Sequence, residues 1–281
     1  MKVSIKIKEY FLKHGLRPAL ILCFVLGVAI LILLNVLQQR QSVVNRENME
    51  EKQLAFIREK LQYEAGFVNE RFEAMRHKLL MMSKHQTQLI KFEPEPNFVL
   101  PDDYELTVTK AIYDKGTESH PAESTLTYTS IRQLPMSIAV RDIVTSAKQV
   151  PLMKEIVNSV SYLVAAWSVS VDGMMRYYPW IDSRNILPHN MDVHEYNFIY
   201  LANPENNPKR TWVWLSAYLD PAGQGWMVSC ISPIYKGDTW RSVCGVDITL
   251  GNLANDFLRE EITGIPVSGL FVDASCTIID M

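Results

Sequence analysis

Hydrophobic positions divide the chain into one unbroken apolar run, a long stretch with helical spacing and a region of short β-rich runs. The apolar run covers residues 18–37, and Asn35 is its only strongly polar member. A helix of about twenty residues spans about 30 Å, which matches the hydrocarbon core of a bilayer. The run has neither the short apolar core nor the small-residue cleavage site of a secretory signal peptide. The sequence therefore predicts an uncleaved transmembrane helix at residues 18–37, with a buried core helix as the alternative.

The charges before this run favour one orientation in the membrane. Lysine and arginine accumulate on the cytoplasmic side of membrane spans. The residues before the run hold one acid, Glu9, against five bases: Lys2, Lys6, Lys8, Lys13 and Arg17. We therefore expect residues 1–17 in the cytoplasm, and the chain from about Gln38 onward outside the plasma (inner) membrane.

Residues 38–92 have the pattern of one long amphipathic helix. From about Ser42 to Lys91 the sequence has no proline and a single glycine, Gly66. Apolar residues recur every seven positions, with further apolar residues three or four positions between them. This apolar stripe consists of Leu54, Ile57, Leu61, Ala65, Val68, Phe72, Met75, Leu79 and Met82. About fifty helical residues are about 75 Å long. The stripe fits either a parallel coiled coil with a second copy of the chain or packing against the chain's own domain.

A globular domain follows the long helix, and we place it at residues 93–251. Prolines at positions 94 and 96 end the helix, because proline cannot continue one. The pattern over residues 97–134 is weak and indicates loops with one strand. Two helices that each begin with a proline follow, at residues 135–150 and 151–160.

Five β-rich runs complete this domain: residues 162–171, 174–178, 211–219, 225–235 and 242–250. The turn residues Asp172-Gly173, and those at 220–225 and 236–238, connect neighbouring runs too tightly for a crossover helix, so the sheet must be antiparallel. A five-stranded antiparallel sheet with helices to one side is a PAS-like α+β domain. The connection at residues 180–210 is long for a compact domain, and long ordered loops are usually functional.

Composition and cysteine positions narrow the classes of function. A net charge of −3 with 21% charged residues gives no basic excess for binding nucleic acid. Cys230 and Cys244 lie on the two arms of one predicted hairpin, where a disulfide is conceivable in an oxidising compartment. The particular geometry of a bridge favours the other interpretation, two small buried hydrophobic residues.

The sequence offers no convincing catalytic or metal-binding motif. It has no glycine-rich phosphate loop and no nucleophile elbow. The close pair His189 and His194 has the spacing of neither a helical metal pair nor a zinc knuckle. We therefore predict no catalytic residue, no metal site and no cofactor.

Aromatic and acidic residues gather between residues 177 and 247. Aromatic faces attract an ammonium group and carboxylates fix it, so this mixture suits a small cationic or zwitterionic solute. The predicted ligand-binding residues are Tyr178, Trp180, Tyr200, Trp214, Tyr218, Asp220 and Asp247. For each aromatic residue the alternative is a place in the core, and Asp247 could instead cap a helix that begins near Asn252.

The same region resembles the double Cache family, the extracytoplasmic sensor modules of bacterial signalling receptors. The resemblance covers roughly residues 177–258 and is carried by Asn207-Pro208, Trp214, Tyr218, the run 220–229, Pro233-Ile234-Tyr235 and the run 245–250. It implies a PAS-like fold for the membrane-distal domain. It also implies that residues 252–281 hold a linker helix and the start of a second, membrane-proximal lobe, truncated in this sequence.

In amino-acid-binding members of this family, an arginine and aromatic residues precede a tyrosine and two aspartates that complete the pocket. The resemblance puts four residues at such positions: Tyr200, Tyr218, Asp220 and Asp247. The arginine position is occupied by Asn197 or a close neighbour, and asparagine cannot make the bidentate contact of arginine with a ligand carboxylate. An amine or an atypical amino acid is therefore as plausible a ligand as a standard amino acid.

Together these observations predict the sensor region of a membrane-anchored receptor of the histidine kinase (two-component) or diguanylate cyclase type. We expect a homodimer through the long helix and signalling by helix movement, with no reaction in this chain. The alternatives are an extracytoplasmic enzyme with Asp220 and Asp247 as an acid–base pair, or a protein-binding module.

Overall fold

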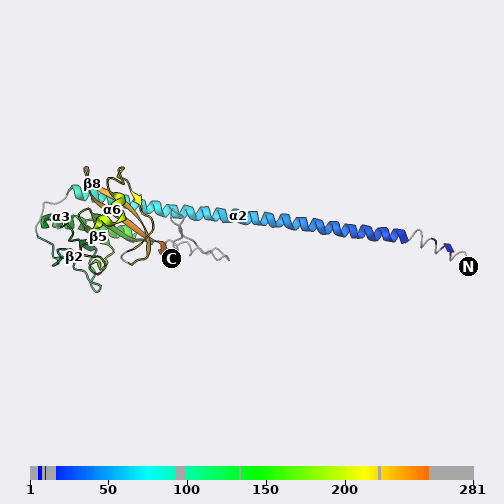
Figure 1. Ribbon diagram of the computed structural model, residues 1–281, viewed down its shortest axis with the longest axis horizontal. Coiled ribbons are helices and arrows are strands. Elements are labelled where there is room, and N and C mark those ends of the chain that lie inside the picture. The colour runs from blue at the N-terminus through cyan, green and yellow to red at the C-terminus, as the bar shows by residue number, and fades with distance from the viewer. Residues whose placement is uncertain are drawn as a thin grey trace. The chain divides into compact units, whose positions relative to one another are not determined.

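The computed structural model describes the following residues: 6–7, 10, 17–92, 99–132, 134–220 and 223–252. The chain divides into two compact units, residues 1–67 and residues 68–281, and Figure 1 shows their elements. The predicted linker helix and second lobe at residues 252–281 lie outside the described residues, apart from Asn252.

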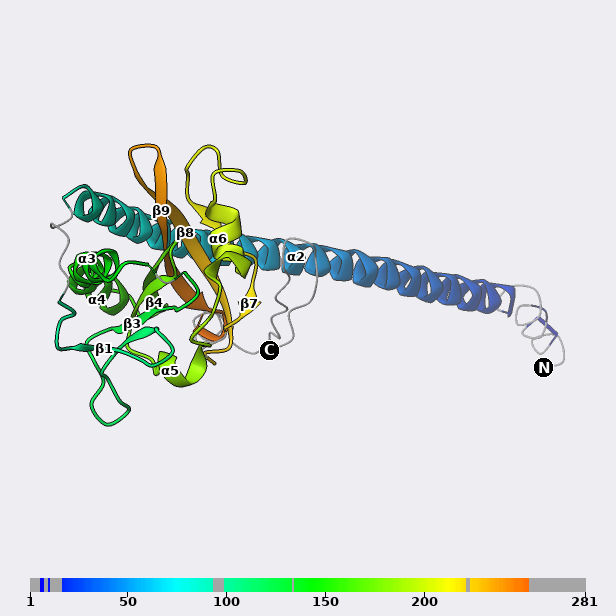
Figure 2. The same ribbon diagram turned by 60° about the vertical axis from the view of Figure 1, so that its left-hand side comes forward.

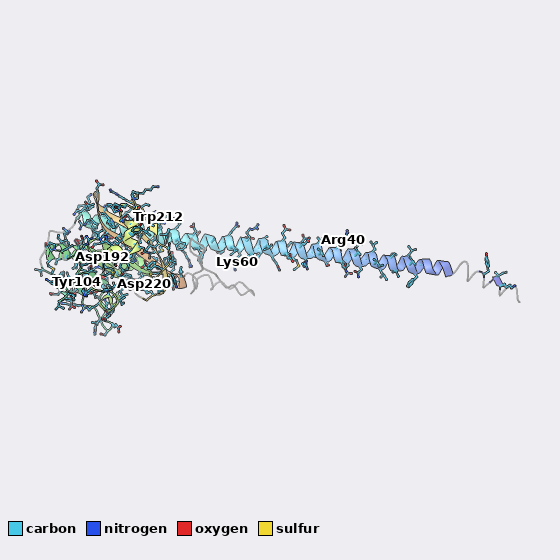
Figure 3. All side chains as sticks on the ribbon, in the orientation of Figure 1. Arg40, Lys60, Tyr104, Asp192, Trp212 and Asp220 are labelled. Atoms are coloured by element: carbon cyan, nitrogen blue, oxygen red, sulfur yellow. The ribbon has the colours of Figure 1, made fainter. Side chains whose placement is uncertain are left out.

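Helix α2 (Arg17–Lys91) contains both the predicted apolar span and the predicted long helix. In the first unit its apolar stripe is exposed at Leu54, Ile57 and Leu61. Figure 3 shows side chains leaving this part of the helix on all sides, among them Arg40 and Lys60. An 18-residue window of α2 has a mean hydropathy of 1.8 and none of it is buried, so by length and composition alone the helix can cross a membrane.

In the described part of the second unit, nine strands form one antiparallel sheet. They are β1 (Tyr104–Leu106), β2 (Ile112–Asp114), β3 (Thr125–Tyr128), β4 (Leu163–Ser170), β5 (Met174–Tyr178), β6 (Val213–Trp214), β7 (Tyr218–Leu219), β8 (Trp226–Lys236) and β9 (Thr239–Thr249). The order is β1-β2-β3-β5-β4-β9-β8-β6, and β7 also pairs with β8. The strands β5-β4-β9-β8-β6 give the PAS-like order, so the predicted fold class is confirmed.

The strand boundaries depart from the sequence analysis in two places. Residues 97–134 contribute three strands instead of one, and these short strands extend the sheet beyond the expected five. The predicted strand at 211–219 is two short strands, β6 and β7, which pair with different parts of β8. The hairpin predicted at Asp172-Gly173 is present, and Gly173 has the positive φ of 95° that glycine tolerates best.

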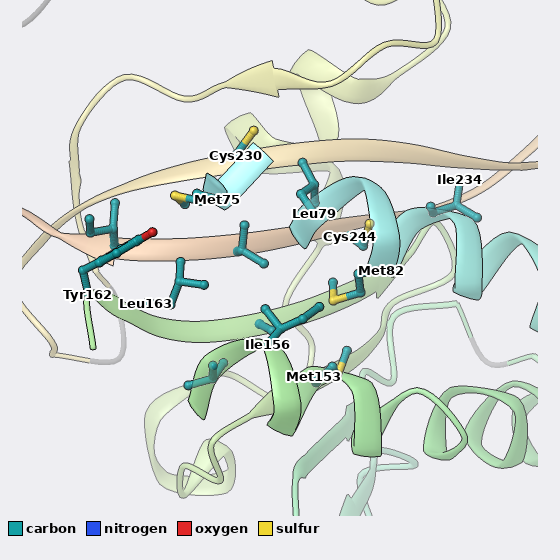
Figure 4. Close-up of a cluster of buried hydrophobic side chains, with 14 of the residues drawn as sticks. Met75, Leu79, Met82, Met153, Ile156, Tyr162, Leu163, Cys230, Ile234 and Cys244 are labelled. Atoms are coloured by element: carbon teal, nitrogen blue, oxygen red, sulfur yellow. The ribbon is translucent and has the colours of Figure 1, made fainter. Parts of the chain in front are cut away.

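Three helices cover one face of the sheet: the C-terminal part of α2, α3 (Met136–Ala147) and α4 (Val150–Asn158). Figure 4 shows the core between α2, α4 and the sheet, in which Met75, Leu79 and Met82 are fully buried. Full burial of one such side chain contributes about 1.5–3 kcal/mol. The apolar stripe therefore packs against the chain's own domain from about Val68 onward.

The other face of the sheet is covered by the long connection after β5. This segment contains α5 (Ser183–Ile186), the 3₁₀ helix η2 (Val193–Glu195) and α6 (Asn197–Ala202). Ile199 of α6 and Val193 of η2 pack on the strands beneath them, and Figure 2 shows α6 beside β8. The connection at residues 180–210 therefore packs on this face of the sheet.

Cys230 and Cys244 are free and buried on the α2 face of the sheet. Cys230 stands opposite Val246 and Cys244 opposite Ser232, so the two thiols are diagonal neighbours and not a directly opposed pair. Burial raises the pKa of the Cys230 thiol to about 12. Their interpretation as small buried hydrophobic residues agrees with this packing.

Candidate functional site

A buried carboxylate lies on the sheet face beneath the α6 segment. Asp247 of β9 is 2% exposed. Its Oδ1 accepts a hydrogen bond of 2.7 Å from Ser229 Oγ on β8, and Trp167 Nε1 on β4 lies 2.8 Å from both carboxylate oxygens. The register places Ser229 directly opposite Asp247, so the three side chains share one face of three adjacent strands.

Gly245 makes the position of Trp167 possible. The two residues are paired between β4 and β9. A Cβ atom at position 245 would lie 2.7 Å from Cη2 of Trp167 and closer still to two other ring atoms, so the indole lies directly on the glycine backbone. This close approach lets the indole N–H reach the carboxylate two residues further along the strand.

Burial makes Asp247 harder to ionise than an ordinary aspartate. Desolvation raises its pKa to about 7, although the hydrogen bonds from Ser229 and Trp167 act in the opposite direction. The negative charge of Asp220 raises the pKa further, and among the described residues no lysine, arginine or histidine contributes to the shift. This carboxylate therefore ionises near neutral pH, and the described part of the chain supplies no cation to balance its charge.

Two tyrosines extend this arrangement toward the β7–β8 turn. The hydroxyls of Tyr218 and Ser229 are 2.7 Å apart, and Gln224 Nε2 donates to the hydroxyl of Tyr177 over 3.1 Å. Burial raises the pKa of both phenols, so they stay neutral at physiological pH. We call Trp167, Tyr177, Tyr218, Ser229 and Asp247 the Asp247 cluster.

Asp220 lies at the edge of the Asp247 cluster. Its Oδ2 accepts a hydrogen bond of 3.1 Å from the backbone N–H of Gln224, in the turn between β7 and β8. Its charge acts on Asp247, Tyr177 and Tyr218. The turn therefore adds a second carboxylate beside the buried one.

Aromatic side chains of the α6 segment cover the cluster. The rings of Phe198 and Trp167 meet edge to face at 5.2 Å, and Tyr196 stacks on Phe198 at 5.4 Å. The site therefore combines two acidic groups, neutral hydroxyls and several aromatic rings under a short helix.

The structure brings three of the seven predicted site residues together: Tyr218, Asp220 and Asp247. Tyr178 and Trp214 point to the opposite face, where Trp214 contacts Phe72 of α2 at 4.9 Å between ring centroids. The reason is strand alternation, since Trp214 pairs with Cys230, which faces α2. These two aromatic residues therefore pack in the core on the α2 face and lie outside the Asp247 cluster.

Two further predicted residues also lie outside the cluster. Trp180 follows β5 and donates its Nε1–H to Asp114 over 2.8 Å. Tyr200 is 57% exposed on α6. Asn197, at or near the position of the family's arginine, begins α6 and is exposed.

Other residues of the site were not among the predicted ligand-binding residues: Trp167, Tyr177, Ser229, Tyr196 and Phe198. The signal that could have found Trp167 and Ser229 is the alternation of side chains along a strand. Gly245 and Asp247 are two residues apart on β9 and face the same side, so their partners Trp167 and Ser229 face that side too. The described residues that hydrogen-bond to the carboxylate of Asp247 are Trp167 and Ser229, while Thr249 Oγ1 accepts the hydrogen bond of 3.2 Å from the N–H of Asn252.

Comparisons with protein-family models and with curated proteins found no match. Solved structures that match part of this chain include the ligand-binding domain of the Pseudomonas aeruginosa chemoreceptor PctB with L-Gln (19% identity, TM-score 0.35, 44% of this chain and 48% of that chain). Two others are those of Pseudomonas fluorescens CtaA with L-leucine (20%, 0.36, 48% and 51%) and Campylobacter jejuni Tlp3 with L-norvaline (16%, 0.34, 53% and 55%).

The chain thus spans about half the length of the chemoreceptor domains that it matches. The strand order gives the chain the PAS-like α+β fold expected of a Cache-type sensor domain.

Proposed function

We propose that residues 93–251 are the ligand-sensing domain of a membrane-anchored receptor, and that the ligand is a small amine or amino acid held by Asp247. The observation that carries this proposal is the buried carboxylate of Asp247, which has no cationic partner among the residues that the structure describes. An ammonium group supplies the missing charge and up to three N–H donors, and aromatic rings around it add cation–π attraction.

The arrangement of polar groups supports an ammonium group as the recognised part. Asp247 and Asp220 carry negative charge, and Ser229 and Tyr218 offer neutral oxygens. In this cluster no arginine is available to clamp a ligand carboxylate, so specificity for a full amino acid would need backbone or hydroxyl contacts. The solute reaches the carboxylate when the aromatic cover of Tyr196 and Phe198 moves aside.

The two faces of the sheet give a route for the signal. Asp247 lies between Val246 and Ile248, which belong to the same core as Met75, Leu79 and Met82 of α2. A solute that changes the twist or register of β9 therefore acts on residues in contact with the helix. The solute shifts the helix only as far as its affinity differs between the two arrangements.

We further propose residues 18–37 as the membrane anchor, with residues 1–17 in the cytoplasm and the sensor domain outside. The exposed stripe at Leu54, Ile57 and Leu61 supports a homodimer through α2, because a monomer leaves this apolar surface in water. Histidine kinase, diguanylate cyclase and chemoreceptor outputs all suit such a signal.

The test is a thermal-shift screen of the full chain in detergent against amino acids, amines and carboxylates. A ligand at a hundred times its dissociation constant adds about 2.7 kcal/mol, or about 5–10 °C for a domain of this size. The Asp247→Asn variant should lose the shift. Asp114→Asn is the matched control, because Asp114 is also buried and also accepts from a tryptophan Nε1–H, outside the cluster. A screen in which no solute stabilises the wild type would refute the proposal.

One observation favours a second function. A carboxyl group that titrates near pH 7 is suited to general acid–base catalysis, so Asp247 and Asp220 are candidates for an acid–base pair. Incubation of each stabilising solute with the chain, followed by NMR, separates the two functions. Turnover that disappears in Asp247→Asn would make the chain an enzyme, and an unchanged solute supports the sensor.

A further inference from the structure

A small cavity lies on the α2 face of the sheet, on the side away from the Asp247 cluster. It has a volume of about 30 Å³ and is bounded by α2, α3, β4 and β9. Its lining includes Gln86 of α2, Thr145 of α3, Ser168 of β4 and Ser242 of β9. A cavity needs about 10–15 Å³ to hold one water molecule, so this one has room for one or two.

Two buried polar atoms at this cavity have no hydrogen-bond partner among the described residues. They are Gln86 Oε1 and Thr145 Oγ1, and both residues are 6% exposed. The amide nitrogen of Gln86 is fully used, because Nε2 donates to both Ser168 Oγ and Ser242 Oγ. An unpaired buried acceptor costs about 1–3 kcal/mol, so such atoms are normally satisfied by water or by a ligand.

The charged groups at the cavity favour a neutral occupant. Asp142 lines it, and its Oδ1 lies 3.2 Å from Arg141 Nη2 and 3.7 Å from Arg241 Nη2. This carboxylate already has two guanidinium partners, so a cation would meet two positive charges and an anion would meet Asp142. Water carries no charge and both donates and accepts.

We propose that the cavity is a structural hydration site, in which one or two ordered waters link Gln86 of α2 to Thr145 of α3. The water donates to Gln86 Oε1 and shares a hydrogen bond with Thr145 Oγ1. It thereby adds a link between α2 and α3 beside the hydrogen bonds that Gln149, just after α3, makes with the Met82 carbonyl and the His85 ring of α2. At this level the contact between α2 and the sheet is polar, whereas at Met75, Leu79 and Met82 it is apolar.

The hydration site lies directly behind the Asp247 cluster. Trp167 and Ser168 are neighbours on β4, and strand alternation points one to Asp247 and the other to Gln86. After a small shift of β4, a hydrogen bond to water can re-form with the water in a new position. A packed apolar contact accommodates such a shift less easily. The proposed hydration site depends on the cavity and on its two polar atoms that have no partner among the described residues. It does not depend on the identity of the proposed ligand.

The test is the sign of the stability change in Thr145→Val, which removes the hydroxyl and keeps the shape. If water satisfies Thr145 Oγ1, the variant loses a hydrogen bond and the unfolding midpoint of the full chain falls by about 2–4 °C. If the hydroxyl has no partner, valine removes an unpaired polar atom and the midpoint stays or rises, which would overturn the proposal. Tyr128→Phe is the matched control, because the Tyr128 hydroxyl is also buried and unpaired among the described residues but does not line the cavity. Its midpoint should not fall.

A second measurement does not depend on any variant. A crystal structure at a resolution that shows ordered water should contain a peak within hydrogen-bond distance of both Gln86 Oε1 and Thr145 Oγ1. An empty cavity contradicts the proposal.

A third measurement tests for a cation in the cavity. Sodium is exchanged for potassium or ammonium at equal ionic strength, and the unfolding midpoint of the wild type is compared with that of Thr145→Val. A midpoint that depends on the cation in the wild type but not in Thr145→Val contradicts the proposal.

Discussion

The buried Asp247 makes the free energy of unfolding depend on pH. An aspartate in the unfolded chain titrates near pH 3.9, whereas burial raises the pKa of Asp247 in the folded chain to about 7. The folded state therefore binds this proton more tightly. Between about pH 4 and pH 7 it holds more protons than the unfolded state, so stability falls as pH rises through this window and levels off above it. A difference of about three pKa units corresponds to about 4 kcal/mol.

The Asp247→Asn variant isolates this effect. Asparagine keeps the shape, can still accept from Trp167 and cannot ionise. In urea unfolding, the stability of the variant relative to wild type should rise by up to about 4 kcal/mol from pH 4 to pH 8, or about 2 M in the urea midpoint. Ser229→Ala removes a hydrogen bond that lowers the pKa of Asp247. The pH range over which the stability of this variant falls should therefore extend to higher pH than in the wild type. A difference between wild type and Asp247→Asn that stays constant with pH refutes the reasoning.

Three further predictions concern the contact of Gly245 with Trp167, the buried Arg176 and the pairing of two chains through α2. Gly245→Ala puts a methyl group into the indole of Trp167 and should cost about 2–3 kcal/mol in urea unfolding, and wild-type stability would contradict the close contact. Arg176→Ala removes a buried guanidinium that donates to Ser146 Oγ and to the carbonyl of Ile143, and should cost about 3 kcal/mol in the same assay. A loss below about 1 kcal/mol would show that these bonds contribute little. Sedimentation of the anchor-free chain should detect a weak dimer that Leu61→Glu disrupts, and a monomer at all accessible concentrations argues against pairing through α2.

The sequence could predict much of the fold because its patterns are local. Heptad spacing and the absence of proline indicate α2, and Asp172-Gly173 indicates the β4–β5 hairpin. Of strands β1–β3 only one was expected, because all three are three or four residues long, too short for alternation to stand out. Their pairing with one another and with β5 is set by tertiary contacts.

The candidate site could be predicted only in part, because residue type does not reveal the face of a strand. Asp247, Asp220 and Tyr218 were predicted from the concentration of aromatic and acidic residues together with the family resemblance. Trp214 looked equally suitable, yet its pairing with Cys230 turns it toward α2. Trp167 was missed because its role depends on the glycine opposite it on β9, a pairing that no local pattern discloses.

The central claim is that Asp247 binds the cationic group of a solute, and the pH dependence of binding tests it most directly. The proton and an ammonium group compete for the same carboxylate, whose pKa is about 7 in the folded chain. For a solute that stays protonated throughout, calorimetry should show the Kd weakening about tenfold per pH unit below pH 7, and Asp247→Asn should bind poorly at every pH. A wild-type Kd that is constant from pH 5 to pH 8, or undiminished binding by Asp247→Asn, would contradict the account.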